Sequence, residues 1–382
     1  MPPDKKIFII AGEPSGDLHA AHLVRSMRSG SPGIQFYGLG GNLLRKEGVE
    51  SYYDITDLAL VGTIEVLQKL AKIREVYRGL IRKIDEIRPD LAILVDYPGF
   101  NLRIADALKR RGIPIVYFIS PQVWAWGRNR IKIIRRYVDK IIVFFKFEEE
   151  LYRRHGINVE FVGHPLIDVA KPSLSRDQMR CHYDLRARYT VAVLPGSRTT
   201  EVEQLLPEIL AAGETIRARL GDVQFLISKA SGLEVSLYTR PMERHPALDA
   251  RLVEESVYNI LLASDFAIVA SGTATLECAL IGTPMLIVYK ASWITWALFR
   301  VVSRISSVGL VNIVAGKKIV PELLQFDVRP EKIAAETIGF LEDEKRRAEI
   351  SAQLGMIRNS LGEPGAYDRS ARAILALLKA AA

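Results

Sequence analysis

Short, β-branched apolar segments recur along the chain, and amphipathic helical patterns separate them. Uncharged runs of this kind are typical of buried parallel strands, and strands that alternate with helices form βαβ units. Because the rhythm stops near residue 170 and restarts near residue 189, we expect an α/β protein with two doubly wound, Rossmann-like domains. The expected strands cover residues 7–11, 91–95, 115–118, 140–144, 190–194, 224–227, 266–269 and 285–288.

Prolines, serines and charged residues interrupt the pattern between the two sets of strands. Two Rossmann-like domains are expected to face each other across a cleft at the carboxyl ends of their sheets, where ligands bind in such folds. The apolar helix at 366–380 is expected to pack either on the N-terminal domain or on a second copy of the chain. The predicted divisions are an N-terminal domain over 1–170, a linker over 171–188, a C-terminal domain over 189–345 and helices over 346–382.

Composition and charge narrow the class of protein. Of the 382 residues, 49% are hydrophobic and 25% are charged, which excludes a disordered chain. Residues 1–170 hold 26 Lys and Arg against 20 Asp and Glu, so an anionic partner is expected for this half. Basic residues are not interleaved with stacking aromatics, so nucleic acid is not expected as a partner. No signal-peptide core and no 18-residue apolar run occur, which predicts a cytoplasmic protein without membrane spans.

Two loops of the N-terminal half follow predicted strands. In the first, Glu13 and Asp17 would repel a diphosphate, so the loop suits neutral sugar hydroxyls better than NAD. Alternatively, Ser15 and Asp17 only cap the helix that begins there. In the second, Asp96 ends an uncharged strand, where burial raises the pKa of a carboxyl group and makes it a candidate base. The alternative for Asp96 is an ordinary turn residue before Pro-Gly.

Two loops of the C-terminal half offer groups that bind anions. Arg198 follows a Gly-Ser turn and supplies a planar set of donors, unless it is a solvated arginine on a plain turn. Residues 271–273 begin a helix whose N-terminus attracts a diphosphate, and Glu277 lies one turn further, where it can accept hydrogen bonds from ribose hydroxyls. The predicted diphosphate and ribose site consists of Gly196, Ser197, Arg198, Ser271, Gly272, Thr273 and Glu277.

No metal or cofactor is predicted. Two cysteines cannot form a Cys-rich zinc site, and no D-x-D pair stands at a strand end to hold a metal–nucleotide. The sequence also lacks a P-loop, an H-E-x-x-H and a G-x-S-x-G motif. Arg198 and the helix N-terminus therefore have to stabilise a leaving diphosphate without a metal ion.

Three further features allow two interpretations each. An apolar stretch followed by clustered cations either binds a membrane surface or packs in the core. Trp124 and Trp126 either line an acyl or sugar pocket or pack between the domains. His164 either touches a ligand or has a structural role. The candidate membrane contacts are Leu60, Val61, Ile64, Leu67 and Leu70.

Six motifs stand in the order in which they occur in the lipid-A-disaccharide synthase family, and the sequence resembles that family from about residue 7 to residue 378. The resemblance implies a GT-B fold and an inverting glycosyltransferase. The motifs span Ala11–Asp17, Asp96–Asn101, Ser120–Trp126, Pro195–Arg198, Ser271–Glu277 and Asn312–Gly316.

What the resemblance implies is specific. The donor would be UDP-2,3-diacylglucosamine and the acceptor 2,3-diacylglucosamine 1-phosphate (lipid X). The products would be the β-1,6-linked disaccharide 1-phosphate and UDP, formed without a metal. The reaction would belong to lipid A biosynthesis for the Gram-negative outer membrane, on the cytoplasmic face of the inner membrane, with the enzyme as a peripheral protein.

The resemblance also implies roles for single residues. Asp96 would be the general base, Glu13 would lie near the reacting sugar, and Asn312 would lie beside the nucleotide. The sugar- and acceptor-binding set would be Glu13, Ser15, Asp17, Asn101, Trp124 and Trp126.

Other functions fit parts of the same pattern. One alternative is a different UDP-sugar enzyme, such as a UDP-N-acetylglucosamine 2-epimerase or a lipid-linked glycosyltransferase. Another is a non-catalytic nucleotide-sugar binding protein at the membrane surface. An NAD oxidoreductase is disfavoured by Glu13 and by the missing G-x-G-x-x-G spacing.

Overall fold

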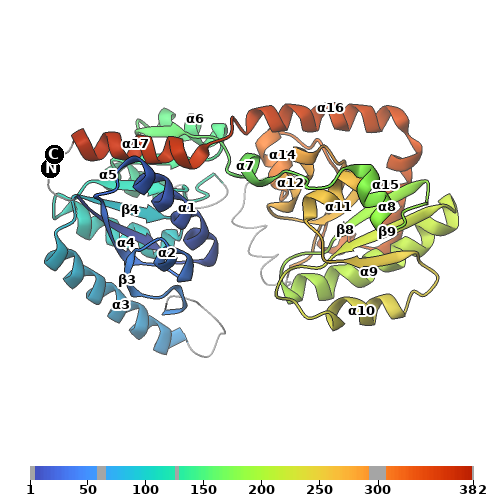
Figure 1. The fold of residues 1–382 in the computed structure, drawn as a ribbon, viewed down its shortest axis with the longest axis horizontal. Helices are drawn as coiled ribbons and strands as arrows, with labels where there is room; N and C mark the ends of the chain where they lie inside the picture. Colours follow the sequence, from blue (N-terminus) through green and yellow to red (C-terminus); the bar gives the residue numbers. More distant parts are fainter. Residues whose placement is uncertain (1–4, 58–65, 125–128, 292–306, 381–382) are drawn as a thin grey trace. The chain divides into compact units, whose positions relative to one another are not determined.

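Two parallel sheets organise the chain, each in its own compact unit (Figure 1). The structure is a computed structural model that describes residues 5–57, 66–124, 129–291 and 307–380. The first unit consists of Met1–Pro165 together with Glu363–Ala382, and the second unit is Leu166–Gly362. The predicted α/β class with two parallel sheets is thereby confirmed.

The first unit contains a sheet with the strand order β3-β2-β1-β4-β5-β6-β7, and every neighbouring pair is parallel. The change of direction beside β1 is the point at which doubly wound sheets bind ligands. The strands are β1 (Lys6–Ala11), β2 (Gln35–Leu39), β3 (Glu50–Tyr53), β4 (Leu91–Val95), β5 (Ile115–Phe118), β6 (Lys140–Val143) and β7 (Val159–Phe161).

Strand β1 shows why its sequence is a continuous apolar run. Ile7 and Ile9 point to one side of the sheet, where they pack with apolar side chains of α1 and α17. Phe8 and Ile10 point to the other side, where α3 and α4 supply the partners. Both faces of the strand are therefore buried, as in other parallel sheets. The helices of this unit are α1 (Pro14–Gly30), α2 (Asn42–Lys46), α3 (Val66–Ile87), α4 (Pro98–Lys109), α5 (Asn129–Tyr137), α6 (Lys146–Arg154) and α17 (Ala366–Ala380).

Helix α17 packs along α1 in the first unit, although some 200 residues of the second unit separate it from β7 in the sequence (Figure 1). The ring of Tyr367 stacks on His22 with 4.9 Å between centroids. The hydroxyl of Tyr367 lies 2.7 Å from Nδ1 of His19. Ile374 and Leu378 complete the apolar contact. The last helix is thus a structural part of the N-terminal sheet domain.

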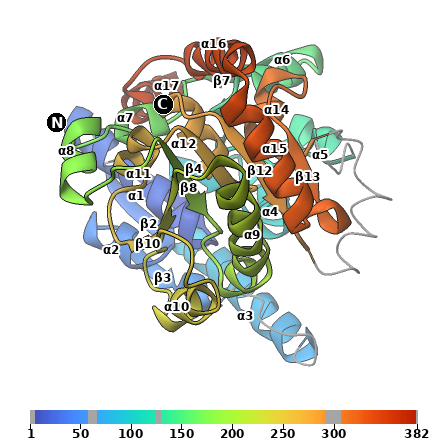
Figure 2. The same cartoon turned by 90° about the vertical axis from the view of Figure 1, so that its right-hand side faces the viewer.

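The second unit contains a parallel sheet with the order β10-β9-β8-β11-β12-β13. Helices α9 and α15 lie side by side on one face of this sheet (Figure 2). The strands are β8 (Tyr189–Leu194), β9 (Val223–Ser228), β10 (Ala250–Val253), β11 (Phe266–Ala270), β12 (Met285–Tyr289) and β13 (Glu322–Leu324). The helices are α7 (Leu166–Val169), α8 (Arg176–His182), α9 (Thr199–Leu220), α10 (Ser236–Glu243), α11 (Val257–Ala263), α12 (Ala274–Ile281), α14 (Leu310–Ala315), α15 (Pro330–Glu342) and α16 (Glu344–Ser360).

Two segments differ from the expected divisions. Residues 171–188, expected as a linker, contain α8, which packs on α11 within the second unit. Helix α16 also belongs to the second unit, where it packs on α12. Among the helices that the structure describes, none is long and apolar enough to cross a membrane.

Candidate functional site

The loop after β1 is shaped by a close contact with the loop after β4. A Cβ atom at Gly12 would lie 2.5 Å from Cδ1 of Tyr97, so only glycine fits there. Glu13 follows as an exposed residue and Pro14 begins α1. The two loops therefore meet at the carboxyl ends of neighbouring strands β1 and β4.

Asp96 has an unusual backbone. Both Asp96 and Tyr97 have φ values of 44°, in the left-handed region that non-glycine residues rarely adopt. The carbonyl oxygen of Asp96 accepts hydrogen bonds from the Tyr117 hydroxyl at 2.6 Å and from Nδ2 of Asn101 at 2.8 Å. Such strain costs on the order of 1–3 kcal/mol per residue and is concentrated at functional sites.

The carboxyl group of Asp96 has the electrostatic properties of a base. Its pKa is raised to about 6, mainly by burial and also by the nearby Glu13 carboxylate, while a hydrogen bond from the Tyr97 backbone opposes both effects. A carboxylate with this pKa is deprotonated at neutral pH and is more basic than an exposed one. Asp96 and Glu13, predicted from separate motifs, therefore lie in one site.

Two other residues of the predicted acceptor set have structural partners. Asp17 is buried, and its carboxylate accepts hydrogen bonds from the backbone N–H groups of Gly41, Leu43 and Leu44 at the start of α2. Asn101 is fully buried below Asp96 and supports the backbone there. Neither side chain is presented to a ligand, since both are enclosed by the loops that they hold in place.

The remaining N-terminal candidates are partly described. Ser15 is exposed in the first turn of α1, and the indole Nε1 of Trp124 donates to Glu148 at 3.2 Å. His164 is buried against the rings of Phe144 and Phe145. Burial, with a smaller effect of His19, lowers the pKa of His164 to about 3, so the ring is neutral. Its ring contacts with Phe144 and Phe145 are packing contacts. Trp126, Leu60, Val61 and Ile64 lie outside the described residues, as do the side chains of Leu67 and Leu70 in α3.

A pocket of about 400 Å³ lies within the second unit at the carboxyl ends of β8, β9 and β11. It brings the two predicted anion-binding loops together with the predicted ribose carboxylate. Because parallel strands end at the same edge of a sheet, loops 75 residues apart in sequence form one wall of the pocket. The predicted residues that line it are Gly196, Ser197, Arg198, Ser271, Gly272, Thr273 and Glu277.

Glu201 organises the first of these loops. Its carboxylate accepts from the backbone N–H groups of Ser197 at 2.9 Å and Arg198 at 3.3 Å, and Nη1 of Arg198 donates to it at 3.0 Å. Gly196 has a φ of +125°, and a Cβ atom there would lie 2.5 Å from the Glu201 side chain. The loop thus needs glycine at this position, and its N–H donors converge on the Glu201 carboxylate.

Glu277 is half-buried in the first turn of α12. Burial raises its pKa, and a hydrogen bond of 3.1 Å from the Tyr258 hydroxyl opposes that rise. Sequence reasoning missed Tyr258, and it also missed Ser228, Ala230 and Val257, which line the pocket. The signal for Ser228 and Ala230 was available, because they follow a predicted strand.

Asn312 does not line this pocket. Its side chain is buried and bonds the backbone of Ile319 and Val320 and the carboxylate of Glu322. Glu322 in turn accepts from the backbone N–H of Val308, whose carbonyl accepts from the Ser271 hydroxyl at 2.9 Å. The structure therefore connects Asn312 to the pocket indirectly, through a buried polar network.

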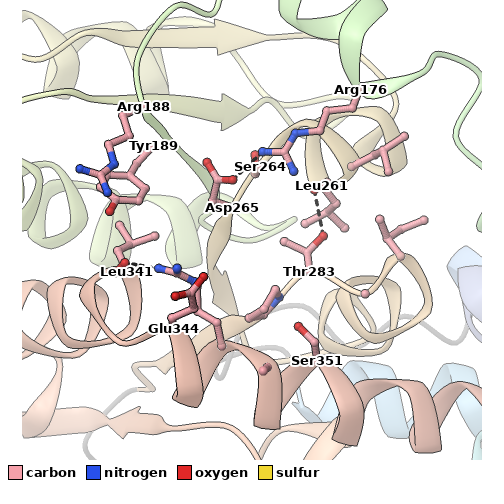
Figure 3. A pocket seen from close by; sticks show the side chains of 16 residues that line it. Arg176, Arg188, Tyr189, Leu261, Ser264, Asp265, Thr283, Leu341, Glu344 and Ser351 are labelled. Atoms are coloured by element: carbon pink, nitrogen blue, oxygen red, sulfur yellow. Dashed lines mark hydrogen bonds and ion pairs between the residues drawn. The ribbon is translucent and has the colours of Figure 1, made fainter.

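A second hollow of about 620 Å³ lies at the opposite edge of the same sheet, where β8, β11 and β12 begin (Figure 3). Arg176 forms an ion pair of 2.5 Å with Asp265 there, and the Thr283 hydroxyl donates to the carbonyl of Leu261. Ligands of doubly wound sheets bind at the carboxyl ends of the strands, so this hollow is not the expected site. Among the described residues, no cluster of three or more His, Cys, Asp or Glu could hold a metal ion.

Comparison with solved structures defines the class. UDP-N-acetylglucosamine 2-epimerase from Neisseria meningitidis, bound to UDP-GlcNAc, superposes with a TM-score of 0.61 at 12% identity over 98% of this chain and 99% of that chain. MurG from Acinetobacter baumannii has a TM-score of 0.62 at 15% identity over 98% of this chain and 99% of that chain. At this identity the likeness concerns the fold alone: the chain has the GT-B-like fold of glycosyltransferases and UDP-sugar epimerases.

Sequence comparison then gives the family. The family described as Lipid-A-disaccharide synthetase matches residues 7–376. The lipid-A-disaccharide synthase of Syntrophus aciditrophicus is 44% identical over 376 residues, covering 98% of each chain. That of Geobacter sulfurreducens is 40% identical over 374 residues, covering 98% of this chain and 97% of the relative. The chain belongs to the lipid-A-disaccharide synthetase family, as the resemblance of its motifs predicted.

Proposed function

We propose that the chain transfers 2,3-diacylglucosamine from UDP to the 6-hydroxyl of 2,3-diacylglucosamine 1-phosphate, with UDP as the leaving group. Family membership supports the activity. The single observation that carries the assignment of roles is the pocket of the second unit, where a Gly-Ser-Arg loop, a helix N-terminus and Glu277 line one space. Those are the groups that recognise a diphosphate and a ribose.

We assign the donor to that pocket and the base to Asp96. In the transfer step, Asp96 takes the proton of the acceptor 6-hydroxyl as its oxygen forms a bond to C1 of the donor sugar. The bond from C1 to the diphosphate oxygen breaks, and UDP leaves with the electron pair. Attack opposite the leaving group inverts the configuration at C1, giving the β-1,6 linkage.

We assign the stabilisation of the leaving diphosphate to Arg198 and to the backbone donors at the start of α12. Preorganised donors of this kind stabilise charge that develops in a transition state. The assignment requires no metal ion, so a chelator is expected to leave the rate unchanged.

The decisive experiment measures UDP release with and without the acceptor, in the wild type and in two variants. Release that depends on the acceptor distinguishes a transferase from an epimerase or a binding protein. Asp96→Asn is expected to lose on the order of 10²-fold or more in kcat, because the base is removed, and to keep its UDP affinity. Arg198→Ala is expected to weaken UDP binding as well as turnover.

Two outcomes would contradict the assigned roles. Weakened UDP binding in Asp96→Asn would move Asp96 from catalysis to binding. A rate that falls with chelator and returns with a divalent cation would reject the metal-independent step.

We also propose that the first unit works as a peripheral protein at the cytoplasmic face of the inner membrane. Arg74, Arg78 and Arg82 are exposed on α3 with a spacing of four residues, so they lie on one face of the helix. A row of arginines attracts anionic headgroups, each contributing about 1 kcal/mol near the surface. The apolar stretch 58–73 precedes these arginines in the sequence.

Cosedimentation with vesicles that contain phosphatidylglycerol tests the membrane proposal. Reversing Arg74 and Arg78 to Glu is expected to reduce binding by about tenfold or more, and Leu67→Ser with Leu70→Ser is expected to reduce it further. Reversal of two arginines on α5, Arg135 and Arg136, serves as the matched control. Equal losses from both reversals would indicate that net charge, and not the α3 face, controls binding.

A further inference from the structure

A buried carboxylate that interacts electrostatically with Asp96 has no role in the mechanism above. Glu148 is 5% exposed and stands in the first turn of α6. Its Oε1 accepts hydrogen bonds from the Ser120 hydroxyl at 2.8 Å and from Nε1 of Trp124 at 3.2 Å. A carboxylate with two such donors holds both of their side chains in fixed positions.

The segment that Glu148 holds runs next to Asp96. It follows β5, whose residue Phe118 accepts a hydrogen bond of 3.1 Å from the backbone N–H of Asp96. Ile119 then adopts a φ of 65°, and the chain leaves the sheet. One turn after Glu148, the Tyr152 hydroxyl donates to the carbonyl of Pro121 at 3.3 Å. Helix α6 thus holds residues 120–124 through the side chains of Ser120 and Trp124 and through the backbone carbonyl of Pro121.

We propose that Glu148 is a positioning residue of the acceptor site, which fixes the Ser120–Trp124 segment so that the Trp124 ring forms a wall of the site beside Asp96. The inference rests on the proposed function, because it takes the acceptor sugar to bind at Asp96. An indole ring gives a sugar a large, rigid apolar surface, and its value as a wall depends on a fixed orientation.

The electrostatics of Glu148 fit a role in geometry. Its pKa is raised to about 7: burial is the main cause and the Asp96 carboxylate adds to it, while the hydrogen bonds from Ser120 and Trp124 oppose the rise. Among the described residues, the titratable groups that interact electrostatically with Glu148 are Asp96, which follows β4, and Tyr152 on α6. Both the charged and the neutral carboxyl group retain an oxygen that accepts from the indole. Glutamine retains that oxygen as well, whereas alanine does not.

Steady-state kinetics with Glu148→Gln and Glu148→Ala test the inference. In Glu148→Ala the KM for the acceptor is expected to rise about tenfold or more, because the indole and the hydroxyl lose their common partner. The donor KM is expected to stay within about twofold of the wild type, and Glu148→Gln is expected to retain most of the acceptor affinity. Glu150→Gln, an exposed carboxylate on the same helix, is the control. An unchanged acceptor KM in Glu148→Ala, or an equal rise in Glu148→Gln, overturns the inference.

A second measurement needs no substrate, so it separates this inference from the proposed function. The chain has four tryptophans, and the indole ¹⁵N–¹H signal of Trp124 is identified by its loss in Trp124→Phe. In the wild type this signal is expected to titrate with a midpoint near pH 7. It is expected not to titrate in Glu148→Gln. The same titration in both proteins would show that the Glu148 carboxyl group does not hold the indole.

Discussion

Asp96 combines an unusual backbone conformation with a hydrogen-bonded carbonyl and a half-buried carboxyl group. Its φ is positive, its carbonyl is held by Tyr117 and Asn101, and its carboxyl group is half-buried near Glu13. Each feature alone occurs in ordinary turns. Together they hold the carboxylate in a position that is less hydrated than that of an exposed carboxylate. That combination is the physical basis for treating Asp96 as the base.

The pH dependence of the rate tests the electrostatic part. The base acts only when deprotonated, so the rate is expected to fall as the pH drops through about 6. The Glu13 carboxylate raises the pKa of Asp96, and Glu13→Gln removes that charge and therefore lowers this pKa. The acidic limb of the kcat/KM profile is expected to move to lower pH in Glu13→Gln, whatever the loss in absolute rate. A limb that stays in place or moves to higher pH would mean that another group controls it, and Glu150→Gln provides the comparison.

The sequence predicted loops at the strand ends, but it could not predict the hydrogen-bond partners of each side chain in them. Asp17 and Asn312 belong to the expected motifs, and both are bonded to backbone groups of a neighbouring loop. The sequence does not show whether a carboxylate or an amide side chain forms its hydrogen bonds with a ligand or with backbone N–H groups. Arg198 and Glu277 line one pocket because the strand before each of them fixes where its loop lies, and their roles in UDP binding stay predictions.

At the scale of elements, the sequence predicted the inner strands and missed the edges. The expected strands correspond to β1, β4, β5, β6, β8, β9, β11 and β12. The four strands at the sheet edges, β3, β7, β10 and β13, were not predicted, and neither was β2. Edge strands are short and partly exposed, so they lack the uncharged run that marks a strand buried on both faces.

The polar network around Asn312 supports a prediction about elements. Asn312→Ala leaves the buried backbone groups of Ile319 and Val320 without partners, at a cost of about 1–3 kcal/mol for each such group. The free energy of unfolding is therefore expected to fall by about 2 kcal/mol or more, and UDP affinity is expected to fall only through the loosened contact at Ser271. Urea unfolding and calorimetric titration with UDP measure the two effects. Asn359→Ala, which changes an exposed asparagine in α16, is the control. If Asn312→Ala lost UDP affinity at unchanged stability, Asn312 would be a direct nucleotide contact.

At the scale of the whole molecule, one unit is continuous in sequence and the other is not. Residues 166–362 include every described residue that lines the proposed donor pocket, and they form their own sheet and core. The first unit needs α17, which follows the second unit in the chain. A continuous unit with its own core is able to fold alone.

A fragment of residues 166–362 is expected to fold and to bind UDP with an affinity within about threefold of that of the full chain. Circular dichroism establishes folding, and calorimetry measures the affinity. The same fragment with Arg198→Ala is the negative control. A folded fragment that does not bind UDP would show that the pocket needs residues of the first unit.

The return of the chain to the first unit also sets an order of events on the ribosome. The apolar side of α1 is synthesised early, yet its partners Ile374 and Leu378 emerge only after the whole second unit. At roughly 5–20 residues per second, that interval lasts about 10–40 s. During this time the nascent N-terminal sheet domain carries an uncovered apolar surface, whereas the second unit can already complete its fold. The N-terminal domain is thus the last to mature, and the interval before α17 emerges is the period in which chaperones would protect it.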